Sequence, residues 1–101
     1  MSNQKQNPPQ QKINMSLPEA VADGIYSNFV IISHSQAEFV LDFARITPGV
    51  QKTKVQSRII MAPSHAYRLM KTLEENIKRF ENTHGKLIVD NDKQREIGFS
   101  I

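Results

Sequence analysis

Hydrophobic positions in this chain first alternate with the period of a β-strand and later recur with the period of an α-helix. Residues 25–33 are mostly β-branched or aromatic, and apolar groups fall at both odd and even positions of this run. The run is too short for a helix, and it predicts a central strand that is covered on both faces. The polar residues 34–36 follow it and predict a turn.

Two further strands are predicted after this turn. Between residues 37 and 47, Phe39, Leu41 and Phe43 alternate with residues of the opposite face, which is the pattern of a half-buried strand. A helix could also gather apolar residues of this run on one side, but the alternation favours the strand. Residues 52–61 have an apolar inner face and a basic outer face, which is typical of a strand with one wet side or at the edge of a sheet.

A long helix is predicted from Pro63 onward, because proline is well tolerated in a first helical turn. His84 and Gly85 predict its end, so it spans about 21 residues, or roughly 31 Å. Apolar residues recur along it at steps of three and four, as on a helix that faces a core; a partner groove or a coiled coil is the alternative. This stripe consists of Ala66, Leu69, Met70, Leu73, Ile77 and Phe80.

The order of these elements predicts an α+β fold. We expect a three-stranded antiparallel meander, with room for a fourth strand, followed by one long C-terminal helix. Residues 1–19 are rich in Gln, Asn and Pro and have little to bury, so a disordered N-terminal tail is expected. Residues 20–85 form the predicted β-β-β-α domain, and residues 86–101 a C-terminal tail or a short edge strand.

The small size of the chain predicts a homo-oligomer. A folded part of roughly 65 residues buries only about 60% of its surface and is marginally stable alone. There is no cysteine, so disulfides cannot compensate. We expect Phe29, Phe39, Leu41 and Phe43 in the core. One helix covers part of a sheet, so apolar groups on the other face would stay exposed in a monomer: Tyr26, Val30, Ile32, Val40 and Ile60. Val30, Ile32 and Val40 are the predicted subunit contacts.

The charge distribution leaves two interpretations open. The formal net charge is +3, and no acidic residue lies between Asp42 and Glu74. A solvated basic face explains this pattern. The alternative is a surface for anionic partners such as nucleic acid, with contacts from Arg45, Lys52, Lys54 and Arg58.

The sequence predicts no catalytic residues, no metal site and no cofactor, and therefore no enzyme. His34, Glu38 and Asp42 are spaced by four, but the predicted turn separates His34 from the other two. Ser33 and Ser64 adjoin histidines without a nucleophile-elbow motif. No Gly-rich phosphate loop is present. No apolar run approaches the ~20 residues of a membrane helix, so a soluble, cytoplasmic protein is expected.

Two segments carry a resemblance to a known family. Residues 32–43 with Thr47-Pro48-Gly49, and residues 58–66 with residues 73–77, resemble a small bacterial and archaeal family without assigned activity, the domain of unknown function numbered 3467. The resemblance covers roughly residues 22–84. It implies a prokaryotic cytosolic setting and transfers no catalytic residue.

The predicted function is that of a non-enzymatic, oligomeric protein-interaction or structural module, with a holdase-like chaperone as one variant. The alternative is a nucleic-acid-associated protein that uses the basic strand and its neighbours.

Overall fold

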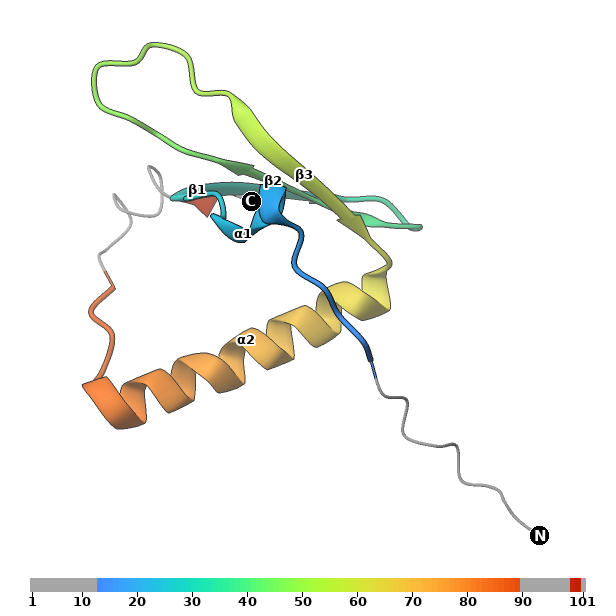
Figure 1. Cartoon of the computed structure of the whole chain (residues 1–101), viewed down its shortest axis with the longest axis vertical. Helices are drawn as coiled ribbons and strands as arrows, with labels where there is room; N and C mark the ends of the chain where they lie inside the picture. Colours follow the sequence, from blue (N-terminus) through green and yellow to red (C-terminus); the bar gives the residue numbers. More distant parts are fainter. Residues whose placement is uncertain (1–12, 90–98, 101) are drawn as a thin grey trace, which may run out of the picture.

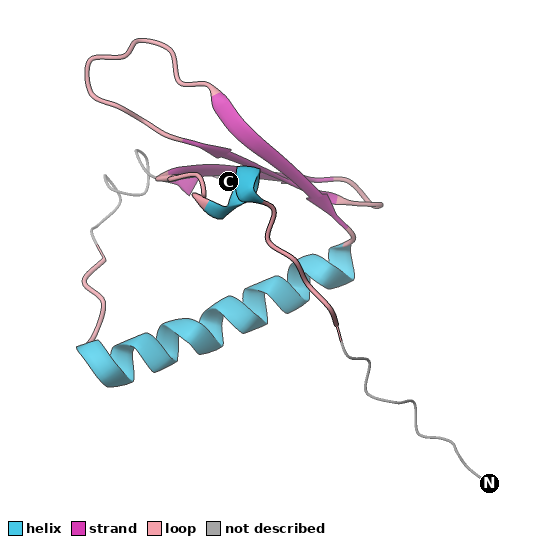
Figure 2. Ribbon diagram, in the orientation of Figure 1, coloured by secondary structure: helices cyan, strands magenta, loops and turns pink. Residues whose placement is uncertain are grey.

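The computed structural model describes residues 13–89 and 99–100 and confirms the predicted fold class. Three antiparallel strands form a meander, a long helix follows, and a short fourth strand joins the sheet (Figures 1 and 2). In chain order the elements are α1 (Glu19–Ala22), β1 (Phe29–His34), β2 (Phe39–Ala44), β3 (Val55–Met61), α2 (Pro63–His84) and β4 (Phe99–Ser100).

The strands lie in the order β3-β2-β1-β4. β2 pairs antiparallel with β1 on one side and with β3 on the other. β4 lies parallel to β1, beside Val30 and Ile31 only, so the fourth strand does not extend the antiparallel meander. Residues 1–12 of the predicted N-terminal tail lie outside the described residues. In the predicted C-terminal segment 86–101, residues 90–98 and 101 also lie outside them.

The strand that is covered on both faces is β2 and not, as the sequence predicts, the first strand. Leu41 on one face of β2 is 7% exposed, and Asp42 on the other is 8% exposed. In β1, by contrast, Ile31 and Ile32 are 39% and 38% exposed. The reason is the pairing: β2 has a neighbour along its whole length on both sides, whereas β4 accompanies β1 for two residues.

The register assigns each side chain to one of two sheet faces, because directly paired residues point to the same side. We call them the Leu41 face (Val30, Ile32, Phe39, Leu41, Phe43, Ile59) and the Asp42 face (Phe29, Ile31, Val40, Asp42, Ala44, Arg58, Ile60). Sequence reasoning placed Val30, Ile32, Val40 and Ile60 on one common face, and that grouping is wrong. The pairs Ile32–Leu41 and Val40–Ile60 lie on opposite faces.

Side chains close both ends of the β1–β2 hairpin. At the turn, the Ser35 backbone N–H donates to the Glu38 carbonyl at 2.9 Å, and the Ser35 hydroxyl accepts from Ala37 N–H at 3.1 Å. At the open end, the Asn28 amide forms two bonds with the backbone of Ile46, accepting from its N–H at 2.8 Å and donating to its carbonyl at 3.1 Å. Asn28 therefore prolongs the pairing beyond Ala44 in place of backbone groups.

α2 begins at Pro63 and ends at His84, close to the predicted bounds. Gly85 follows with φ 92°, a conformation that residues with a Cβ rarely adopt, and its N–H donates to the Glu81 carbonyl at 2.8 Å. Figure 1 shows the helix beneath the sheet, joined to β3 through Ala62. The expected packing of the helix stripe into a core is wrong for the single chain, since α2 has no buried residue.

Few hydrophobic side chains are buried in the described part of the chain. Val30, Leu41 and Ala44 are the buried hydrophobic residues there, and no large side chain is fully buried. The predicted core residues Phe29, Phe39 and Phe43 are only half-buried. The chain by itself therefore forms a sheet with a small interior, and the large apolar residues of the α2 stripe remain about half exposed to solvent.

We expect Asn28→Ala to lower the free energy of unfolding by about 1–3 kcal/mol, because two backbone groups of Ile46 lose their partner. Urea unfolding followed by circular dichroism measures the change. Asn76→Ala is the control: its amide bonds the Thr72 carbonyl on the exposed surface of α2, and the expected change is about 0.5 kcal/mol or less. Equal effects of the two substitutions would contradict the role of Asn28.

Candidate functional site

The apolar stripe of α2 is an exposed hydrophobic surface among the described elements. Its members follow a heptad pattern, with Met70 and Ile77 at one core position and Ala66, Leu73 and Phe80 at the other. All but Ala66 are exposed, Leu73 most of all at 55%. His84 lies against Phe80 with the two rings tilted and their centroids 4.8 Å apart, and it extends the stripe to the last helical turn. An exposed apolar seam of this kind is suited to pack against a second helix or a sheet face.

A two-pronged ion pair crosses from β3 to β2 on the Asp42 face. The Arg58 Nε donates to Asp42 Oδ1 at 2.7 Å, and Arg58 Nη2 donates to Asp42 Oδ2 at 2.9 Å. The hydrogen bond from Arg58 holds the pKa of the Asp42 carboxyl below its usual value; burial opposes this shift and the guanidinium charge supports it. The same bond raises the pKa of Arg58. Sequence reasoning missed the pair, although a lone charge in the middle of each apolar strand was a usable signal.

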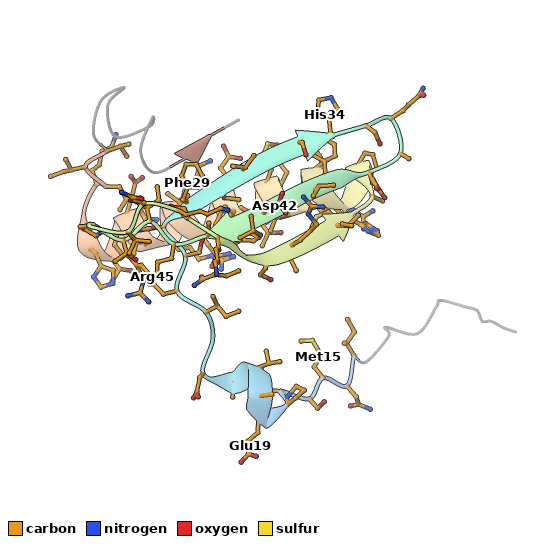
Figure 3. The ribbon with its side chains drawn as sticks, turned by 90° about the horizontal axis from the view of Figure 1, so that it is seen from above. Met15, Glu19, Phe29, His34, Asp42 and Arg45 are labelled. Atoms are coloured by element: carbon orange, nitrogen blue, oxygen red, sulfur yellow. The ribbon has the colours of Figure 1, made fainter. Side chains whose placement is uncertain are left out.

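The four predicted anion-contacting residues do not form one group. Arg58 already pairs with Asp42. Arg45 lies over the Tyr26 ring, 5.6 Å from its centroid, and Figure 3 shows it at the end of the sheet opposite to His34. Lys52 and Lys54 lie in the exposed segment between β2 and β3. Among the described residues, Arg45, Lys52 and Lys54 form no ion pair, so three cations near this segment are free.

The predicted subunit contacts differ in their accessibility. Val30 is 7% exposed and lies within the small interior, so it offers little surface to another chain. Ile32 is accessible on the Leu41 face, and Val40 is half-buried on the Asp42 face. Tyr26 and Ile60, which sequence reasoning placed beside them, are exposed.

A shallow hollow lies between α1 and the Leu41 face. Its volume is about 320 Å³, and its lining is mainly apolar: Ala20, Val21, Gly24, Ile25, Ser27, Phe43, Ser57 and Ile59. It is open to solvent and contains no titratable side chain, so it offers apolar contact and no group for acid–base chemistry.

The histidine and serine candidates stand apart from one another. His34 ends β1 and stacks on Phe39, with ring centroids 5.3 Å apart.

Within residues 13–89 and 99–100, the structure brings together no three His, Cys, Asp or Glu residues that could hold a metal ion. No helix in this same part of the chain is long and apolar enough to cross a membrane.

The ion pair predicts how the stability of the folded state depends on pH. The pKa of Asp42 is lowered in the folded state, so its contribution is complete above the unfolded pKa of about 3.9 and is lost as the pH falls through the folded pKa. Arg58→Gln removes the cause of the shift, so Asp42 no longer contributes to the acid decline; we expect a lower melting temperature at neutral pH and a smaller fall of the melting temperature below the unfolded pKa than in the wild type. Thermal melts between pH 2 and 7 measure this. Arg45→Gln, which removes an equal charge away from Asp42, should leave the decline in place.

Comparison with known proteins gave one family and no individual relative. No curated protein and no solved structure matches the chain. The family described as "Protein of unknown function (DUF3467)" matches residues 1–88, a longer stretch than the resemblance in the sequence indicates. This match spans most of the 101 residues and includes every described element except β4. The chain belongs to the family of proteins of unknown function DUF3467.

Proposed function

We propose that this chain is a non-enzymatic module that associates with a second copy of itself through α2 and thereby forms a platform for a protein partner. The observation that carries the proposal is the exposed heptad stripe of α2. Burying a Leu, Ile, Phe or Met side chain contributes roughly 1.5–3 kcal/mol. Four such residues at the heptad core positions of one helix, each about 40–55% exposed, would add this stability if a partner buried them.

The choice of a second copy as occupant rests on the pattern of the stripe. Heptad spacing places successive apolar residues on one seam, and a seam of this kind is satisfied by another helix with the same spacing. Charged residues lie outside the two seam positions; Lys71 and Glu74, for example, pair with each other at 3.5 Å along the helix surface. A second α2 therefore supplies a matching apolar seam without bringing a charge into it.

A protein partner would then meet the surfaces that self-association through α2 leaves free. On the Asp42 face, Ile31 and Ile60 are exposed and flank the neutralised Asp42–Arg58 pair. An apolar patch with a satisfied ion pair at its centre suits a protein surface better than it suits a phosphate backbone, because no free cation lies within it.

We expect the purified chain to have at least twice the 11.5 kDa mass of one copy. Leu73→Arg should raise the dissociation constant at least about tenfold, since a charge would enter the seam. Light scattering over a dilution series measures the mass, and circular dichroism confirms that the helix is retained. Thr72→Arg places the same charge on the polar side of α2 and should leave the mass unchanged. A wild-type monomer with a cooperative melt would refute the proposal.

The nucleic-acid alternative is supported by the free cations Arg45, Lys52 and Lys54. If these residues neutralised phosphates, binding would weaken with salt at a log–log slope of about −0.9 per contact on duplex DNA. Under our proposal we expect only weak binding, with a Kd near 10⁻⁴ M or weaker at physiological salt, the weak limit of non-specific binding.

Fluorescence anisotropy at two salt concentrations separates the two functions. The test variant is Lys52→Gln with Lys54→Gln, because Arg58 is needed by Asp42. Lys71→Gln with Lys78→Gln on α2 is the control with an equal loss of charge. Submicromolar binding that the test variant abolishes and the control retains would favour the nucleic-acid function.

A further inference from the structure

β3 is the outer strand of the sheet, and its free edge is unusually open. In the part of the chain that the structure describes, it pairs with β2 on one side only, whereas β1 at the opposite side is accompanied by β4. Edge strands are normally protected by Pro, Lys, bulges or short length. β3 has seven residues and neither Pro nor Lys, and its one irregularity lies at the Val55 end. The regular part, residues 57–61, is left without protection.

The single charge on β3 is already neutralised within the chain. Arg58 is held on the carboxylate of Asp42 by two hydrogen bonds of 2.7 and 2.9 Å. A free cation in the middle of an edge strand repels an identical strand, since like charges directly opposite each other destabilise a strand pair. The ion pair with β2 removes most of that repulsion, and it leaves the apolar residues Ile59, Ile60 and Met61 to determine what β3 pairs with.

We infer that β3 pairs antiparallel with β3 of a second copy across a two-fold axis at Ile59, and so joins two sheets into one. The inference rests on the self-association proposed above and specifies its geometry. A two-fold axis is the commonest symmetry of protein dimers. Because α2 follows β3 after Ala62 alone, this axis places the α2 helices of both copies on the same face of the joined sheet.

The alternation of side chains limits the possible registers. Opposed residues must point to the same face, so the axis can pass through a residue but not between two neighbours. An axis at Arg58 sets two guanidinium groups opposite each other. An axis at Ile59 instead sets Ile59 against its own copy, Arg58 against Ile60, and Ser57 against Met61. It also brings Ile59, which is 43% exposed in the single chain, against a hydrophobic side chain.

The absence of cysteine from the chain makes the register directly testable with single-cysteine variants. Ile59→Cys should form a covalent dimer on mild oxidation or with a short bis-maleimide, because directly opposed Cβ atoms lie about 4.5–5.5 Å apart. A mixture of Ser57→Cys and Met61→Cys chains should give mainly the mixed dimer. Ile31→Cys is the control, since Ile31 has a similar exposure of 39% but lies on β1.

A second pair of variants tests the same contact without cross-linking. Ile59→Lys sets two like charges opposite each other, and we expect it to raise the dissociation constant at least about tenfold. Ile31→Lys introduces the same charge on β1 and should have no such effect. Light scattering measures both.

The outcomes separate this inference from the proposed function. A wild-type dimer that Leu73→Arg dissociates, but that Ile59→Lys leaves intact and Ile59→Cys does not cross-link, overturns the β3 pairing and leaves the α2 proposal standing. Cross-linking of Ile31→Cys as fast as Ile59→Cys also overturns it. A monomeric wild type overturns both proposals. Selective cross-linking at residue 59 together with the mixed dimer of residues 57 and 61 supports the inferred register.

Discussion

The two-sided pairing of β2 is the interaction on which the rest of this structure depends. Only β2 has an antiparallel neighbour along its whole length on each side, and it contributes Leu41 and Ala44, two of the three buried hydrophobic residues in the described chain. Ser27 and Asn28 bond to backbone groups at the end of this strand and just beyond it. A change that loosens β2 would therefore separate β1 from β3 and leave no other interior to hold them.

The small interior of the sheet contributes little to the stability of α2. α2 is long and well terminated, yet none of its residues is buried. An isolated helix is weakly stable in water, and most helical stability in proteins comes from packing an apolar face. Among residues 13–89 and 99–100 that face has no counterpart of sufficient size, because the sheet buries its few apolar groups around β2. This imbalance between a long apolar stripe and a small sheet interior is the physical basis of the proposed association with a second copy.

The Asp42–Arg58 pair links the interior of the sheet to its edge. Asp42 is buried, so it requires a cation; Arg58 supplies one from β3 and keeps more than half of its own side chain exposed. A buried charge that lost its partner would be costly. The same contact leaves β3 without a free charge at its outer edge. One interaction thus stabilises the β2–β3 pairing and determines what kind of strand β3 can accept.

The sequence by itself determined the local structure of this protein, and the tertiary structure decided which side chains share each surface and what they contact. Alternation at Phe39, Leu41 and Phe43, and the spacing from Ala66 to Phe80 between Pro63 and Gly85, predicted a strand and a helix because these periods depend on neighbours along the chain. Which residues share a sheet face depends on register, and register joins residues far apart in sequence. For that reason the sequence groups Val40 with Val30 and Ile32, and it does not show that Arg58, one of the candidate anion contacts, is bound to Asp42. Whether α2 packs on the sheet was likewise decided only by the fold, because an amphipathic pattern shows that a face needs a partner but not where the partner lies.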